Sequence, residues 1–143
     1  MKSKFEIDPT LSEEWVEFHV REMTPKLQQV IQILSTDKQL WGYDEQVIKL
    51  LDLTKVYSFE SINGKVYAKT DKRNYYVRKK IYELLDILPP DFVKVSRAEL
   101  VNLKYLDHLE LTAGGTIALK LKNGMTTFVS RRCVKNLRER LGI

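Results

Sequence analysis

Three turn-forming residue pairs, each lying between short apolar runs, place the strongest constraint on how this chain can fold. The pairs are Asn63-Gly64, Gly114-Gly115 and Asn123-Gly124. Asparagine and glycine tolerate the positive φ that a tight hairpin turn requires, so these pairs favour antiparallel strands that follow one another directly. The sequence therefore predicts a mainly β fold with short helices, α+β overall.

Short strands are expected beside these turns and at the other apolar runs between polar segments. The expected strands are residues 40–43, 46–51, 56–60, 65–70, 74–77, 92–95, 105–111, 117–121 and 126–129. Two more are expected near the N-terminus, at residues 4–8 and 13–20. In the second of these, Val16, Phe18 and Val20 recur at every other position, which is the period of a strand with one buried face.

Helical spacing of apolar residues predicts three helices and one isolated helical turn. The expected helices are residues 25–34, 78–88 and 131–141, and residues 98–101 are expected to form the single turn. Thr24 is a suitable N-cap and Pro25 a suitable first helical residue. The polar stretch 35–38 should end the first helix, and Gly142 should end the last one.

The distribution of charge divides the chain into two parts. Residues 54–143 hold 18 Lys and Arg against 9 Asp and Glu, a net charge of +9, whereas residues 1–53 hold 6 against 10, a net charge of −4. A basic module behind an acidic segment is typical of a protein that binds a polyanion. We expect an N-terminal strand-helix extension, residues 1–45, that caps the core, oligomerises or receives a signal, and a polyanion-binding domain, residues 46–143.

Composition argues against several other classes of protein. The longest apolar runs are too short to span a membrane, and the N-terminal residues lack the apolar core of a secretory signal. Cys133 is the only cysteine, which excludes an internal disulfide framework and fits a reducing compartment, so the expected location is the cytoplasm. His19 and His108 form no recognisable metal set with it. No cofactor, small-molecule substrate or enzymatic activity is expected.

Two apolar strands each run into a serine followed by arginine, and these junctions carry the most specific chemistry in the chain. They are Ser96-Arg97 and Ser130-Arg131-Arg132. The guanidinium group is planar and always charged, so it suits phosphates and the N7/O6 edge of guanine. The two serines are as well suited to closing the local turn through a backbone hydrogen bond as to contacting phosphate.

From about Val47 to Leu141 the chain resembles the LytTR family of DNA-binding domains. The resemblance rests on a series of stretches in matching order, which are Phe59-Glu60-Ser61, I-N-G-K-V-Y, L-L-D-I-L, F-V-K-V-S-R-A-E-L-V-N-L, L-K-L-K-N-G and V-S-R-R-C-V-K-N-L. The residues before them look like the extension of stand-alone LytTR regulators. The resemblance implies an elongated arrangement of small antiparallel sheets whose loops, and not a recognition helix, enter successive major grooves of DNA.

The same resemblance implies site residues and partners. The loop positions that match are the 62–65 turn with Asn63 and Lys65, then Arg97, and then Arg132 with Arg131 beside it. Ala98 departs from the family, because many relatives carry serine there. The implied partner is double-stranded DNA with paired direct repeats, and hence a homodimer on DNA. Stand-alone relatives are often encoded beside small membrane proteins that restrain them, so a membrane-protein inhibitor is a further implied partner.

A sequence-specific, double-stranded DNA-binding transcription regulator is the leading hypothesis, and two other functions stay open. An RNA-binding β-protein would need exposed aromatic side chains on one sheet face, although strand tyrosines more often serve packing. A small enzyme that uses Cys133 as a nucleophile would need a cleft and an acid-base partner.

Overall fold

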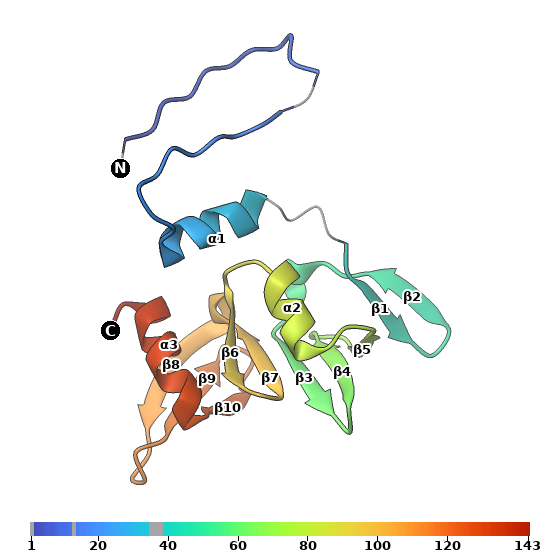
Figure 1. Ribbon diagram of the computed structural model, residues 1–143. Helices are drawn as coiled ribbons and strands as arrows, with labels where there is room; N and C mark the ends of the chain where they lie inside the picture. The colour runs from blue at the N-terminus through green and yellow to red at the C-terminus, as the bar shows by residue number, and fades with distance from the viewer. Residues whose placement is uncertain (1, 13, 35–38) are drawn as a thin grey trace.

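The computed structural model describes residues 2–12, 14–34 and 39–143, which form two antiparallel sheets and three short helices (Figure 1). The larger sheet has seven strands in the order β2-β1-β5-β4-β3-β7-β6, and the smaller has three in the order β10-β9-β8. This arrangement confirms the mainly β, α+β fold that the turn-forming pairs predict.

The larger sheet is assembled mostly from hairpins. Its strands are β1 (Trp41–Asp44), β2 (Val47–Leu50), β3 (Ser58–Ile62), β4 (Lys65–Lys69), β5 (Asn74–Val77), β6 (Phe92–Ser96) and β7 (Glu99–Asn102). Asn63 and Gly64, with φ of 51° and 79°, join β3 to β4 as predicted. Because Ile62 lies opposite Lys65 and Ser58 lies opposite Lys69, the turns before and after β4 are at opposite ends of the sheet.

The smaller sheet and the last helix form the other half of the molecule. Its strands are β8 (Leu106–Leu111), β9 (Ile117–Leu121) and β10 (Thr126–Val129), joined by the two remaining predicted turns. Helix α3 (Arg131–Leu141) follows β10 directly and ends at Gly142, whose φ of 72° is the left-handed conformation that glycine favours at a helix end. Leu137 of α3 is fully buried and fixes the helix to the core.

Two hydrophobic clusters form the core, and strands β6 and β7 contribute to both. The first cluster includes Phe59, Leu100 and Leu84 of α2 (Ile81–Ile87). The second includes Val101 and Leu137. Since neighbouring residues of a strand point to opposite faces, consecutive residues of β7 enter different clusters. These two strands therefore hold the two halves of the molecule in a fixed arrangement.

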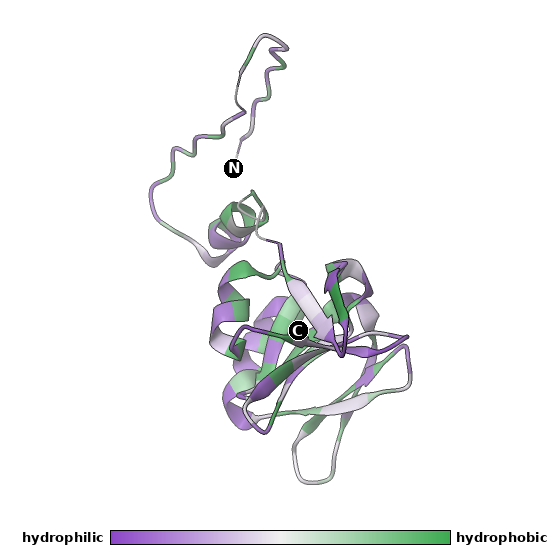
Figure 2. Cartoon of the chain, turned by 90° about the vertical axis from the view of Figure 1, so that its right-hand side faces the viewer, coloured by the Kyte–Doolittle hydropathy of each residue, from purple (hydrophilic) through white to green (hydrophobic). Residues whose placement is uncertain are grey.

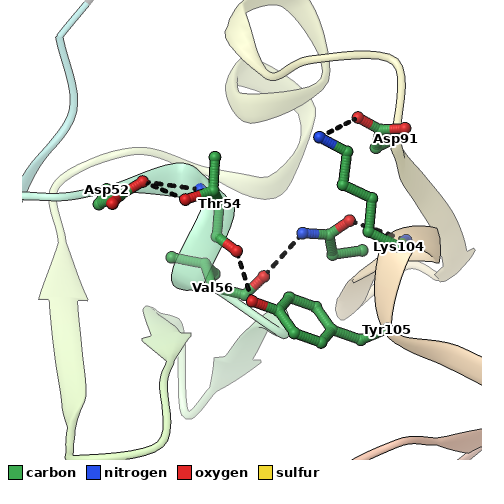
Figure 3. Close-up of polar contacts among 7 residues, drawn as sticks. Asp52, Thr54, Val56, Asp91, Lys104 and Tyr105 are labelled. Carbon is green, nitrogen blue, oxygen red and sulfur yellow. Dashed lines mark hydrogen bonds and ion pairs between the residues drawn. The ribbon is translucent and has the colours of Figure 1, made fainter.

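A buried asparagine reinforces the joint between the halves (Figure 3). Asn102, which is almost fully buried, donates from Nδ2 to the carbonyl of Val56 at 3.0 Å and accepts from the backbone N–H of Lys104 at 3.1 Å. The Tyr105 hydroxyl donates to the carbonyl of Thr54. These bonds connect two short 3-10 helices, η1 (Leu53–Lys55) and η2 (Leu103–Tyr105).

The first helix, α1 (Pro25–Leu34), begins as predicted. The Thr24 hydroxyl oxygen accepts a hydrogen bond from the backbone N–H of Leu27 at 3.2 Å, which is the bond of an N-cap. Leu27 is the buried residue of this helix. The polar stretch 35–38 that was expected to end α1 lies outside the described residues. No helix among those described is long and apolar enough to cross a membrane.

The two strands predicted near the N-terminus are wrong. Residues 2–12 and 14–24, which we call the N-terminal arm, contain no strand where they are described, and the arm leads away from both sheets (Figures 1 and 2). The alternating pattern at Val16, Phe18 and Val20 is real, but these side chains stay exposed. A strand needs a neighbour to satisfy its backbone groups, and the described chain offers the arm none.

Two local predictions in the basic domain also need correction. The helix expected from residue 78 begins at Ile81, because the backbone N–H of Lys80 donates to the Glu83 side chain at 3.1 Å and marks the helix start there. Residues 98–101, expected to form a helical turn, do not form one: Ala98 lies in the turn before β7, and residues 99–101 belong to β7 itself. Leu100 and Val101 are adjacent apolar residues because β7 is buried on both faces.

Candidate functional site

Three segments far apart in the sequence meet at one end of the molecule, and we call them together the turn face. They are residues 61–65, 95–98 and 130–132. Two backbone hydrogen bonds connect them, one from the N–H of Ser61 to the carbonyl of Ala98 and one from the N–H of Ser130 to the carbonyl of Val95, each 2.7 Å long. The β3–β4 turn, the β6–β7 turn and the start of α3 therefore form one continuous rim.

The turn face carries four exposed cations, and all were site candidates from the sequence. They are Lys65, Arg97, Arg131 and Arg132. Within the part of the chain that the structure describes, none of the four forms an ion pair. A surface guanidinium without an acidic neighbour keeps its donors available for an anion outside the chain.

The two serines of the turn face have different environments. The hydroxyl oxygen of Ser96 accepts a hydrogen bond from the backbone N–H of Ala98 at 3.2 Å, so it closes the turn that presents Arg97. Ser130 occupies the N-cap position of α3, but its side chain makes no capping hydrogen bond. Its carbonyl accepts from the N–H of Cys133 at 2.9 Å. Ser96 therefore shapes the loop, and the hydroxyl of Ser130 is the one left for an outside acceptor.

Asn63 lies at the tip of the β3–β4 hairpin and is exposed. Its positive φ is the requirement of the turn, which explains an asparagine here without reference to any ligand. Its side-chain amide nevertheless projects from the same rim as Lys65. The seven residues predicted for the site therefore lie within the three segments of the turn face, and their contact with DNA stays a prediction.

A basic hollow beside the β3–β4 turn was not predicted as part of the site. It has a volume of about 260 Å³ and is lined by Gly64, Lys65 and the triplet Arg78-Lys79-Lys80, among others. The Nζ of Lys80 donates to the carbonyl of Gly64 at 3.3 Å, and the Arg78 guanidinium lies 4.3 Å from the centre of the Tyr43 ring. Three basic residues in a row were the available signal in the sequence. What could not be read from it was that β5 ends beside this turn.

Other basic residues of the larger sheet lie away from the turn face. Lys69 is ion-paired with Glu60, and Arg73 is ion-paired with Asp44 at 2.9 Å. Lys72 is exposed but lies in the turn after β4, at the opposite end of the sheet from Asn63. These three cations are therefore poorly placed to act together with Arg97.

Behind the turn face, Glu99 of β7 joins the larger sheet to the smaller one. Its carboxylate accepts a hydrogen bond from the Thr127 hydroxyl of β10. Removal from water raises the pKa of Glu99, and although the bond from Thr127 opposes this, the negative charge of Glu60 on the neighbouring strand adds to it. The carboxyl thus serves as a support for the two loops and not as a surface charge.

The alternative sites suggested by the sequence find little support. Cys133 is buried in the second hydrophobic cluster. Tyr57 and Tyr75 are buried as well, and the Tyr57 hydroxyl donates to Asp71, which raises the pKa of the phenol to about 12. No group of histidine, cysteine and acidic residues that could hold a metal ion occurs among the described residues.

Comparison with known proteins points in the same direction as the geometry. The family model described as the LytTr DNA-binding domain matches residues 46–142. Two uncharacterized HTH-type transcriptional regulators of Staphylococcus aureus, from strains NCTC 8325 and COL, are each 32% identical to this chain over 146 residues, with 100% of this chain and 99% of the relative covered. A solved LytTr DNA-binding domain from Bacillus cereus has a TM-score of 0.69 and 21% identity, covering 74% of this chain and 99% of that chain.

The solved domain shows the likeness of fold alone, since its identity is low. The names of the Staphylococcus relatives mention a helix-turn-helix, which consists of two consecutive helices joined by a short turn. In this chain five strands separate α2 from α3, and five separate α1 from α2, so no such pair exists within the described residues.

Proposed function

The chain belongs to the LytTr DNA-binding domain family and is a DNA-binding transcription regulator, and we propose that it reads double-stranded DNA in the major groove with the turn face. The observation that carries this proposal is the pair of 2.7 Å backbone hydrogen bonds that link the β3–β4 turn, the β6–β7 turn and the start of α3. They make one rim out of segments that the sequence separates widely. A rim fixed to two sheets presents its side chains with little loss of conformational entropy on binding.

Within this rim, Arg97 and Arg132 are the residues we assign to base reading. Arg97 follows the buried strand β6, and Arg132 lies in the first turn of α3 just after β10, so the backbone of each is fixed while its exposed side chain is free to reach outward. A guanidinium can donate two parallel hydrogen bonds to N7 and O6 of guanine, a pattern that only the major groove offers. We assign Arg131 and Asn63 to contacts with neighbouring positions of the DNA that contribute less to the affinity.

We assign the basic hollow and Ser130 to the phosphate backbone. Lys65 and the triplet Arg78-Lys79-Lys80 add positive charge next to the Asn63-Gly64 turn. Such contacts carry no sequence information, but they fix the register of the turns on the duplex. The net charge of +9 on residues 54–143 supports this assignment.

The family resemblance supports three further proposals about partners. We propose that the binding site consists of paired direct repeats, that two protomers occupy it, and that a membrane protein restrains the regulator. The acidic charge of residues 1–53 favours placing a protein partner there, since phosphate would repel that part of the chain.

Selection of bound sequences from random duplex DNA tests the proposed function. We expect a repeated motif with guanine at the positions protected by the protein, and weaker binding to an RNA hairpin of matching length. If no sequence is enriched, or if the RNA hairpin binds as tightly as the selected duplex, the proposed sequence-specific reading of duplex DNA is wrong. A recovered motif can then be used as the probe for the substitutions described below.

A further inference from the structure

The N-terminal arm has the pattern of a strand but no partner strand among the described residues of its own chain. Residues 14–20 read E-W-V-E-F-H-V, with strand-forming residues at alternate positions. Trp15 is 70% exposed and Val16 63% exposed, so the apolar side chains of the arm remain in water. Figure 2 shows apolar and polar residues following one another along this extended segment, away from both sheets.

Two sheet edges are open among the described residues, and they differ in charge. Strand β2 ends the larger sheet and β8 ends the smaller one. The opposite edges, β6 and β10, lie against each other, as the Ser130–Val95 hydrogen bond shows, and the Thr127–Glu99 bond adds a link from β10 to β7. An open edge presents unpaired backbone N–H and C=O groups that can accept another strand.

The edge at β2 is apolar and basic. Its sequence is V-I-K-L, all four residues are exposed, and Ile48 is 63% exposed. Beside it, Lys49, Lys55 and Lys72 line a hollow of about 310 Å³. The hollow also holds two carboxylates, Asp52 and Asp71, which accept hydrogen bonds from Thr54 and Tyr57, so the three lysines leave an excess of positive charge there.

The edge at β8 carries acidic residues instead. Asp107 and Glu110 flank His108 on this strand and both contact its ring nitrogens. The segment 14–20 itself contains Glu14 and Glu17 and no lysine or arginine. Charge complementarity therefore favours β2 over β8 as its partner, because like charges on neighbouring strands are destabilising.

We propose that residues 14–20 of one protomer add as a strand to the open edge of β2 in a second copy of this chain, forming a dimer by arm exchange. Their seven residues exceed the four of β2, so they can cover the whole edge. Pairing would satisfy the outward backbone groups of β2 and would cover apolar side chains of both segments. Glu14 and Glu17 would lie near the lysines beside β2. The proposal does not depend on DNA binding.

Geometry favours a second copy over the arm of the same chain. Pro25 and Lys26 at the start of α1 line a hollow together with Asn136 and Glu139 of α3, so the arm leaves the molecule on the α3 side. Helix α3 packs against β6, and strand β2 is at the opposite edge of the larger sheet from β6 (Figure 1). Crossing six strand spacings needs about 29 Å, whereas the chain from residue 20 to residue 25 spans at most about 17 Å.

Two variants of the full-length chain test the role of the arm and the role of the β2 edge separately. The double substitution Val16→Pro with Glu17→Pro removes the backbone N–H groups of two consecutive residues of the arm. It therefore blocks pairing whichever set of alternate residues faces β2. Ile48→Pro blocks the edge. In a hairpin with a two-residue turn, the pair that flanks the turn, here Asp44 and Val47, is hydrogen-bonded. Such pairs alternate along an antiparallel ladder, so the next pair, Tyr43 and Ile48, is not hydrogen-bonded. The backbone N–H of Ile48 therefore faces the open edge. Ser3→Pro with Lys4→Pro is the matched control for prolines in the arm.

Sedimentation velocity without DNA is the decisive measurement. We expect the wild type and the control to form a dimer as concentration rises, and each blocked variant to stay monomeric. A mixture of the arm variant and the edge variant should recover one arm–edge contact and associate, although neither does alone. Unchanged thermal unfolding of each variant shows that the domain itself is intact.

Hydrogen exchange gives an independent readout of the same dimer. On association, exchange should slow at residues 14–20 and 47–50. The proposal is overturned if the wild type is monomeric at all concentrations, if the arm variant dimerises like wild type, or if the mixed variants do not associate. Because DNA is absent, none of these failures bears on the proposed reading of DNA by the turn face.

Discussion

At the scale of single residues, the exposed arginines of the turn face differ from other surface cations in how they are held. Ser96 closes the turn before Arg97, and Ser130 begins the helix that carries Arg132. Lys69 and Arg73, by contrast, are neutralised by neighbouring carboxylates. We therefore propose that position relative to a supported turn, more than charge, separates a base-reading residue from a solvated one.

Arg97→Ala and Arg132→Ala should each weaken binding to the best DNA site by about 1–3 kcal/mol and flatten the base preference at one position, because each removes a bidentate contact to a guanine edge. Fluorescence anisotropy with the selected site and with single-base variants of it measures both effects. Lys72→Ala is the matched control, since Lys72 is equally exposed but lies at the far end of the sheet. Wild-type binding by both arginine variants would show that the base-reading residues lie elsewhere.

At the scale of the elements, the close contact of β1 with its neighbours depends on one glycine. A Cβ at Gly42 would lie 2.7 Å from Cδ2 of Leu51 and 2.7 Å from Cβ of Tyr75. The second of these atoms is held by the backbone of β5 and cannot move aside alone. The glycine therefore lets β1 lie within the larger sheet, between β2 and β5.

Gly42→Ala should lower the free energy of unfolding by about 1–3 kcal/mol, as expected for overpacking of a core contact. Urea denaturation followed by circular dichroism measures the change. Gly114→Ala is the control, because nothing lies within 4 Å of a Cβ at Gly114. The control should stay within about 0.5 kcal/mol of wild type. Equal stability of both variants would mean that β1 is not packed as described.

The link between β7 and β10 predicts a dependence of stability on pH. Burial raises the pKa of Glu99 above its ordinary value of 4.5, so the folded state holds this proton more tightly than the unfolded state. The contribution of Glu99 to stability is fully present below pH 4.5 and is lost as the pH rises through the pKa of the folded state. Glu99→Gln keeps an acceptor for Thr127 but removes this loss.

Relative to wild type, Glu99→Gln should therefore gain stability as the pH rises from 4 to 7. Denaturation at a series of pH values gives the difference directly, and using the difference cancels the opposite contributions of Asp52 and Glu110, whose pKa values are lowered. A constant difference across this range would show that Glu99 titrates normally in the folded protein.

At the scale of the whole molecule, we expect the separation of charge to orient the protein on DNA. The basic domain presents its turn face and basic hollow at one end. The acidic N-terminal arm leaves the molecule beside the later part of α3, near Asn136 and Glu139 (Figure 1). The family model begins at residue 46, yet β1 lies inside the same sheet. A fragment that is meant to retain the domain should therefore begin at residue 39.

Binding to duplex DNA should weaken with salt. If the protein neutralises about six phosphates, the logarithm of the binding constant should fall with the logarithm of salt concentration at a slope near −5. Titrations of the selected site at several salt concentrations give the slope. Lys65→Ala should reduce it by about one, and Lys72→Ala should not change it. An affinity independent of salt would remove the electrostatic part of the proposed function.

Local chemistry explains what could be predicted from the sequence. The Asn63-Gly64 turn, the Thr24 cap and the Gly142 helix end each depend on residues within a few positions, and all three are confirmed. The ends of the strands before Arg97 and before Ser130 belong to this group, since an apolar run followed by polar residues is visible in one dimension. The family could also be predicted from the sequence, because its characteristic stretches occur in order along the chain.

Tertiary contacts decided the rest. Strand β7 was mistaken for a helical turn because burial on both faces removes the alternation that marks a strand. The arm has that alternation, but the part of the chain that the structure describes gives it no neighbour to pair with. The single rim of the turn face exists only because Ser61 bonds to Ala98 and Ser130 bonds to Val95, across more than thirty residues in each case. The sequence by itself determined the turns and the side chains they carry, and only the packing of β6 and β7 between two cores brought those turns together.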